Sequence, residues 1–267
     1  MDNRPIGVMD SGLGGLTFVK EIRHQLPNES IVFLGDEARL PYGIKSSSEV
    51  REFSFQIAKY LLKFDIKMFV IACNTATAAA LQFLQEQLDI PVIGVIKPGS
   101  QAATSLTKNH QVGVIATQKT IESLAYTNQI GLLDSKVKVI GLATQSLVKL
   151  VESNQMNTDY AQQIISEQLN FFADYQVDTL ILGCTHFPLL ANEIQSAMGP
   201  EVKLIDSGAE TASVVKELLT KNDVLASQHN DNFLKLLTTG SIIQFEKVAS
   251  NWLQDSKLDI AQVNLGE

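Results

Sequence analysis

The chain has 267 residues, of which 45% are hydrophobic and 19% charged, and its formal net charge is −8. The length allows one large domain or two modest ones, and the composition excludes disordered, collagen-like and disulfide-scaffold chains. The negative charge predicts no nucleic-acid partner and no binding to an anionic membrane. Because no signal peptide and no apolar run of about 18 residues is visible, we expect a cytoplasmic protein without membrane spans.

Short apolar segments alternate along the chain with longer segments of helical periodicity. In the first part, strands are predicted at Ile6–Met9, at Ser30–Leu34, up to Cys73 and at Pro91–Ile96, with helices at Leu16–Leu26, at Ser48–Phe64 and from Asn74 to near Leu88. Pro98-Gly99 and Asp206-Ser207-Gly208 are the predicted hinge points, and the alternation restarts after the segment Lys97-Pro98-Gly99. Beyond it, strands are predicted at Val112–Ile115, at Val137–Leu142, up to Cys184 and at Val202–Ile205, with helices at Ile121–Ile130, at Tyr160–Phe172 and after Asp206-Ser207-Gly208. This alternation predicts an α/β fold with mainly parallel sheets.

The chain contains only two cysteines, Cys73 and Cys184. Their spacing fits no zinc site, and a structural disulfide is not expected without secretion. A free cysteine is most often a small buried hydrophobic residue. However, each of these two ends an apolar strand and precedes a polar turn, and ligands of parallel sheets bind just outside the carboxyl ends of the strands. Both thiols are therefore candidate site residues.

A glycine-rich segment, Asp10–Gly15, follows the first strand and opens a helix. It matches neither the dinucleotide fingerprint nor the phosphate-binding loop. A tight turn and an anion-binding helix start both remain open. Asp10-Ser11-Gly12 recurs as Asp206-Ser207-Gly208, and the sequences around the two cysteines also resemble each other, which is compatible with two similar lobes.

Other polar positions have ordinary explanations when taken alone. Pro41-Tyr42-Gly43 reads as a turn, and Thr117 and Thr120 can cap the helix that follows their strand. Glu152 reads as a solvated helix residue. His186 can share a face with Cys184 if strand geometry continues past the cysteine.

Together these segments resemble the glutamate racemases. The matching motifs are Asp10–Leu16, Pro41-Tyr42-Gly43, Ala72–Ala76, Ala116–Thr120, Gly183–His186 and Asp206–Thr211. The resemblance runs almost end to end. The chain departs from many relatives at Leu40, where they carry a cysteine, and near Ala143-Thr144, where they carry Cys-Pro. Neither departure touches the two thiols.

The resemblance implies two similar α/β lobes with mainly parallel sheets and an active site in the cleft between them. The first lobe would comprise residues 1–96 and 207–267, and the second residues 97–206. The implied activity is a cofactor-independent interconversion of L- and D-glutamate that supplies peptidoglycan synthesis. No metal and no cofactor are implied, and the implied assembly is a homodimer.

Two thiols suit such chemistry, because a single base returns the proton to the face from which it came, whereas two groups on opposite faces invert the carbon. By resemblance, Cys73 acts on D-glutamate with Asp10 beside it, and Cys184 acts on L-glutamate with His186 beside it. The substrate-binding residues implied by the family, besides Asp10 and His186, are Ser11, Pro41, Tyr42, Gly43, Asn74, Thr75, Thr117, Thr120, Glu152 and Thr185.

Four other functions are alternatives to glutamate racemisation. An aspartate racemase would use the same paired chemistry. A decarboxylase of substituted malonates needs only one thiol, so the pair argues against it. A thiol amidase built on Cys184 and His186 would form an acyl-enzyme and would not need Cys73. A non-catalytic amino-acid binding module would turn nothing over.

Overall fold

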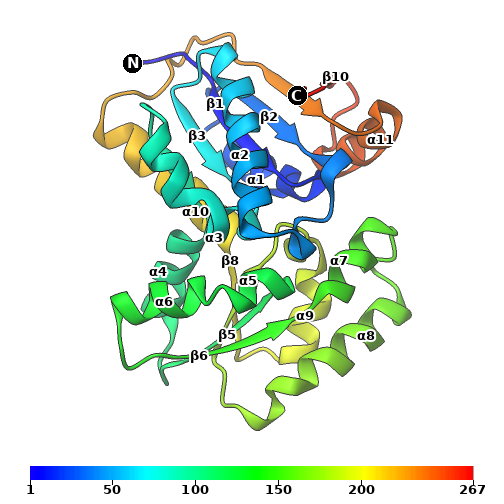
Figure 1. Cartoon of the computed structure of the whole chain (residues 1–267). Helices are drawn as coiled ribbons and strands as arrows, with labels where there is room; N and C mark the ends of the chain where they lie inside the picture. Colours follow the sequence, from blue (N-terminus) through cyan, green and yellow to red (C-terminus); the bar gives the residue numbers. More distant parts are fainter. Residues whose placement is uncertain (267) are drawn as a thin grey trace. The chain divides into compact units, whose positions relative to one another are not determined.

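A computed structural model describes residues 1–266 of the chain and divides them into two compact units (Figure 1). The first unit comprises residues 1–95 together with residues 211 onward, and the second comprises residues 96–210. Each unit contains one sheet, and all strand pairings in both sheets are parallel. The predicted α/β fold with parallel sheets is confirmed. No helix in residues 1–266 is long and apolar enough to cross a membrane.

The sheet of the first unit has six strands in the order β10-β9-β2-β1-β3-β4. These strands are β1 (Ile6–Asp10), β2 (Ile31–Gly35), β3 (Met68–Ile71), β4 (Val92–Gly94), β9 (Leu234–Thr238) and β10 (Asp259–Gln262). The accompanying helices are α1 (Leu16–Gln25), α2 (Ser47–Leu61), α3 (Asn74–Gln87), α11 (Ile242–Leu253) and most of α10 (Ser207–Lys221). The strands β1 and β3 lie side by side, so their carboxyl ends meet at one edge of the sheet.

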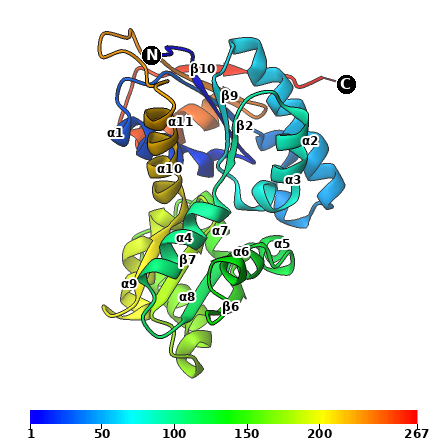
Figure 2. The ribbon, with the colours of Figure 1, turned by 90° about the vertical axis from the view of Figure 1, so that its left-hand side faces the viewer.

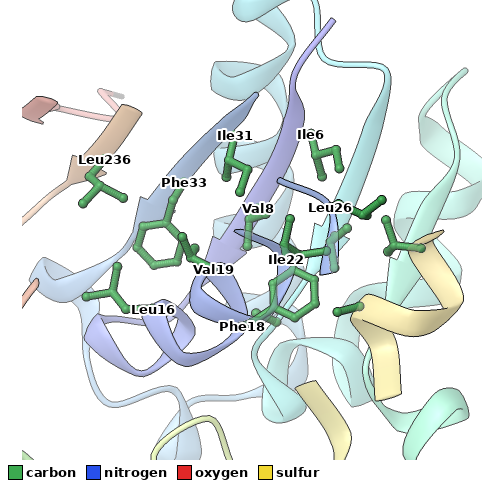
Figure 3. Close-up of a cluster of buried hydrophobic side chains, with 14 of the residues drawn as sticks. Ile6, Val8, Leu16, Phe18, Val19, Ile22, Leu26, Ile31, Phe33 and Leu236 are labelled. Atoms are coloured by element: carbon green, nitrogen blue, oxygen red, sulfur yellow. The ribbon is translucent and has the colours of Figure 1, made fainter. Parts of the chain in front are cut away.

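Alternate residues of the central strands enter two separate hydrophobic clusters, as the period of two in a strand requires. Ile31 and Phe33 of β2 pack in the cluster that contains α1, α10 and α11. Val32 and Leu34 pack in the cluster that contains α2 and α3. Figure 2 shows these two groups of helices on opposite faces of the sheet, and Figure 3 shows the side chains of the first cluster between the strands and α1. Because both faces are covered, the central strands β2 and β3 are apolar throughout, and β1 is apolar up to its last residue, Asp10.

The second unit contains a four-stranded sheet in the order β6-β5-β7-β8. Its strands are β5 (Gln111–Ala116), β6 (Lys138–Ala143), β7 (Thr179–Gly183) and β8 (Lys203–Asp206). Its helices are α4 (Ile96–Leu106), α5 (Gln118–Glu122), α6 (Ala125–Leu133), α7 (Gln145–Glu152), α8 (Asp159–Leu169) and α9 (Ala191–Met198). The strand β7 lies between β5 and β8, which places the end of β7 at the centre of the carboxyl edge.

One sequence prediction in this unit is wrong. The single helix predicted at Ile121–Ile130 is two helices, α5 and α6, because Leu124 between them adopts a left-handed backbone conformation with φ of 55°. Pro98-Gly99, one of the predicted hinge points, lies in the first turn of α4. Proline is tolerated there because the first amides of a helix have no intrahelical acceptor.

The helix α2 begins with a capping box. Ser46 Oγ accepts from Glu49 N (3.2 Å), and Glu49 Oε2 accepts from Ser46 N (2.9 Å). We expect Ser46→Ala to lower the free energy of unfolding by about 1 kcal/mol, the usual contribution of a helix cap. Urea unfolding of this variant would be compared with that of Ser105→Ala, whose hydroxyl only bonds a carbonyl within its own helix α4. Equal stability of the two variants would contradict the capping role.

Candidate functional site

The carboxyl edge of the first sheet carries Asp10, the last residue of β1, and its side chain is fully buried. Its Oδ2 accepts from Gly12 N at 3.1 Å, which holds the turn into the next helix. Gly15 lies so close that an added Cβ would be 2.4 Å from Asp10 Cβ. Gly15 therefore makes room for a buried carboxylate at the end of β1.

Cys73 occupies the N-cap position of α3 on the neighbouring strand end, and it is buried. Its Sγ accepts from Ala76 N (3.4 Å), and its thiol donates to Ser11 Oγ (3.6 Å). Asn74 and Thr75, in the first turn of α3, are buried with it. The structure thus brings together four of the predicted site residues, Ser11, Cys73, Asn74 and Thr75, at the edge that also holds Asp10.

The pKa of Cys73 is raised to about 11, first by burial and then by the negative charge of Asp10. Hydrogen bonds from Ala76 and Ser11 oppose this shift but are weaker. Cys73 is therefore a thiol at neutral pH. Asp10 lies close enough for its charge to raise the pKa of the Cys73 thiol, so an ionised Asp10 does not stabilise a thiolate there.

The Pro41-Tyr42-Gly43 segment also belongs to the first unit and is fixed by a buried carboxylate. The Tyr42 hydroxyl donates to Asp36 Oδ2 at 2.5 Å, and Arg39 Nε donates to the same oxygen at 2.6 Å. Burial and the charges of Asp36 and Cys73 raise the pKa of Tyr42, so its hydroxyl stays protonated. Tyr42 therefore lies near Cys73, as the assignment of both to one site requires.

The carboxyl edge of the second sheet carries Cys184 directly after β7, and the thiol is buried. Cys184 Sγ lies 3.6 Å from His186 Nδ1. His186 is buried as well, and its Nε2 lies 3.7 Å from Oε1 of Glu152, whose side chain is 42% exposed. The three predicted residues thus form a row from the thiol to the surface of this unit.

Burial lowers the pKa of His186 to about 4, so the imidazole is neutral at pH 7 and its contact with Glu152 is not an ion pair there. The carboxylate beside Nε2 favours the tautomer with the hydrogen on Nε2. That tautomer leaves Nδ1 as an acceptor facing the Cys184 thiol. The pair therefore has the arrangement of a thiol and a base.

The buried His186 predicts a pH-dependent stability. Its folded pKa lies below the value of about 6.5 in an unfolded chain, so protonation favours unfolding, and stability present above pH 6.5 is lost as the pH falls toward 4. We expect the wild type to lose about 2 kcal/mol more than His186→Gln between pH 8 and pH 5. Urea midpoints of both proteins at both pH values measure this. An equal loss in the two would show that His186 is not buried and neutral.

Thr117 and Thr120 lie next to this row in the sheet. Ala116 at the end of β5 pairs with Gly183 at the end of β7, so Thr117 and Cys184 follow adjacent strands. Thr117 caps α5 by accepting from Thr120 N (3.4 Å), and the two hydroxyls lie 3.1 Å apart. Both threonines are buried, whereas Thr185 is partly exposed.

Sequence reasoning missed two residues beside these groups. Asp36, which holds Tyr42, directly follows the strand Ile31–Gly35, so the rule that singled out the residues after other strands could have found it. Tyr126, which lies near Cys184, carries no such signal because it lies in the helix α6. Among residues 1–266, no three His, Cys, Asp or Glu residues are grouped so as to hold a metal ion.

Comparisons with known proteins agree on one family. Residues 6–215 match the family described as Asp/Glu/Hydantoin racemase. The chain is 50% identical over 265 residues to a glutamate racemase of Latilactobacillus sakei, covering 99% of this chain and 96% of that protein. A crystal structure of a glutamate racemase isoform from Bacillus anthracis is similar with a TM-score of 0.96 and 42% identity, covering 99% of both chains. One from Francisella tularensis, in complex with D-glutamate, has a TM-score of 0.91 and 37% identity at the same coverage.

Proposed function

Because the chain belongs to the glutamate racemases of the Asp/Glu/Hydantoin racemase family, and is therefore an isomerase, we propose that it interconverts L- and D-glutamate with Cys73 and Cys184 as its two acid/base groups. The observation that carries the mechanism is that each unit holds one buried thiol with a proton acceptor beside it. These are Cys73 with Asp10 and Cys184 with His186. Paired groups of this kind suit an inversion in which one thiol takes the α-proton and the other supplies one.

In the direction from L- to D-glutamate, Cys184 is the base. Its thiol proton passes to Nδ1 of the neutral His186, and the thiolate then removes the α-hydrogen of L-glutamate. The Cys73 thiol delivers its proton to the opposite face of the same carbon and becomes a thiolate. The high pKa of Cys73 supports this half of the proposal, because Cys73 is protonated in the free protein as a proton donor must be.

In the direction from D- to L-glutamate, the roles are exchanged. The Cys73 proton passes to the Asp10 carboxylate, and the thiolate removes the α-hydrogen of D-glutamate. Cys184 then donates its proton. After each turnover the donating cysteine is a thiolate, and the acceptor beside the other cysteine, His186 or Asp10, still holds a proton. The free protein must therefore exchange protons with water before it repeats the same direction.

The remaining predicted residues would hold the substrate. We propose that Ser11, Asn74, Thr75, Thr117 and Thr185, with backbone amides of Tyr42 and Gly43, bind the ammonium group and the two carboxylates. Thr120 and Glu152 would assist, and Pro41 would shape the loop. The oxygens of these residues would accept from the ammonium group and their O–H and N–H groups would donate to the carboxylates, which fixes the substrate and lowers the barrier to proton removal without a cofactor.

A direct assay tests the activity. Dialysed protein is incubated with D-glutamate, with and without added pyridoxal phosphate, and the optical rotation is followed. We expect the rotation to fall to zero at the same rate in both samples. A rate that depends on the added cofactor would contradict a cofactor-independent reaction, whereas activity on aspartate alone would point to an aspartate racemase.

The wider role of the protein follows from the same proposal. A glutamate racemase would supply D-glutamate for peptidoglycan synthesis in the cytoplasm, and the family resemblance implies a homodimer. Sedimentation of the purified protein with and without glutamate would test the homodimer.

A further inference from the structure

Tyr126 is a buried residue of the second unit that the proposed chemistry does not use. A Cβ atom placed on Gly183 would lie 3.3 Å from Cε2 of Tyr126. The ring therefore packs against the backbone of the residue that immediately precedes Cys184. On its other side, a Cβ atom on Gly99 of α4 would lie 3.6 Å from Tyr126 Cε1.

The hydroxyl of Tyr126 is also linked to the end of β7, through hydrogen bonds that involve Ser207. It is hydrogen-bonded to the side chain of Ser207, and Ser207 Oγ donates to the Leu182 carbonyl at 3.2 Å. Because the serine has a single hydroxyl hydrogen, which it gives to Leu182, the Tyr126 hydroxyl must be the donor to Ser207 Oγ. Burial raises the pKa of Tyr126, so the hydroxyl keeps its hydrogen.

The acceptor of this bond is itself held in place. Asp206 pairs with Leu182 in the parallel register of β7 and β8. Asp206 Oδ1 accepts from Gly208 N (2.8 Å) and from Ala209 N (3.2 Å), which fixes the turn that carries Ser207. Ser207 is therefore a rigid link between Tyr126 and the end of β7.

We propose that Tyr126 is a positioning residue for the Cys184 thiol, whose supporting strand it clamps at Gly183 through its ring and at Leu182 through Ser207. The inference rests on the proposed function, since it gives Tyr126 a role in proton transfer at Cys184. The first unit is built differently, because Ser11 contacts the Cys73 thiol directly. The clamp therefore acts on one thiol only.

The first test measures the reactivity of the Cys184 thiol and does not require catalytic turnover. Wild type, Tyr126→Phe and Ser207→Ala are treated with iodoacetamide, and the alkylation of Cys184 and Cys73 is followed by peptide mass spectrometry. We expect the rate at Cys184, divided by the rate at Cys73 in the same sample, to rise at least about threefold in both variants. Tyr160→Phe, on the exposed surface of α8, is the matched control and should leave the ratio unchanged. An unchanged ratio in both test variants would overturn the clamp.

The second test is a double-mutant cycle in glutamate racemisation. Tyr126→Phe and Ser207→Ala should each lower kcat about tenfold with KM within twofold of the wild type, because a small misplacement of a reacting group slows the chemical step. Since Ser207→Ala removes both the hydrogen bond from Tyr126 and the one to Leu182, the double variant should be no slower than Ser207→Ala alone. A loss of about a hundredfold in the double variant, or unchanged kcat in the single ones, would contradict the clamp. A wild type that does not racemise glutamate would instead refute the proposed function, and the alkylation ratio would still test the clamp.

Discussion

Replacing either thiol by serine is expected to lower the rate of glutamate racemisation by about 10²- to 10⁴-fold, the usual contribution of a positioned acid/base group. Serine keeps the size of the cysteine side chain and a hydroxyl donor, but it is a much weaker acid than a thiol. Both cysteines are buried next to polar groups, so serine is accommodated at either position. The measurement is kcat from optical rotation for Cys73→Ser and Cys184→Ser.

The two variants also separate the proposed mechanism from its alternatives. A thiol amidase built on Cys184 and His186 predicts that Cys73→Ser keeps full activity. A decarboxylase predicts that only one of the two thiols matters. Near-equal melting temperatures of both variants and the wild type would show that a lost activity reflects chemistry and not unfolding.

Asp10→Asn should raise the alkylation rate of Cys73 and at the same time lower the rate of glutamate racemisation. Asp10 raises the pKa of Cys73 through its charge, so its neutralisation lowers that pKa and enlarges the thiolate fraction. At pH 9, below the value of about 11 in the wild type, Cys73 should be alkylated several times faster. Racemisation should nevertheless fall by about 10²- to 10⁴-fold, because the variant lacks the proton acceptor.

Asparagine is a close structural replacement, because its side-chain oxygen can still accept from Gly12 N. Asp231→Asn, in an exposed loop of the same unit, is the control and should change neither quantity. If Asp10→Asn slowed the alkylation of Cys73, the carboxylate would be stabilising the thiolate, and its proposed role as proton acceptor would have to be abandoned.

Sequence reasoning located the strand ends that carry Cys73 and Cys184 because both signals are local. Each thiol follows a short apolar run and precedes a polar turn, and such a run in an α/β chain is a buried parallel strand. The contact of Cys184 with His186 could also be anticipated, because only one residue separates them. The positions of these strands within the sheets, and with them the neighbouring side chains, depend on pairings between distant segments.

Contacts between segments that are far apart in the chain could not be predicted from the sequence. The carboxylate of Asp36, which fixes Tyr42, also accepts from Thr239 Oγ1 (2.9 Å) after β9, more than 200 positions away. The strand β9 and the edge strand β10 are short and carry no pattern strong enough to predict them. The break at Leu124, which places Tyr126 at the start of α6, rests on a left-handed leucine that propensity does not foresee.

The measurement that tests the central claim most directly is α-deuterium incorporation in D₂O, followed separately in L- and D-glutamate for the wild type and both serine variants. The wild type should racemise either enantiomer and place deuterium at the α-carbon. With racemisation lost, Cys73→Ser should exchange only L-glutamate and Cys184→Ser only D-glutamate, because each retains the base for one face. Full racemisation by either variant, or exchange of the same enantiomer by both, would contradict the two-thiol account.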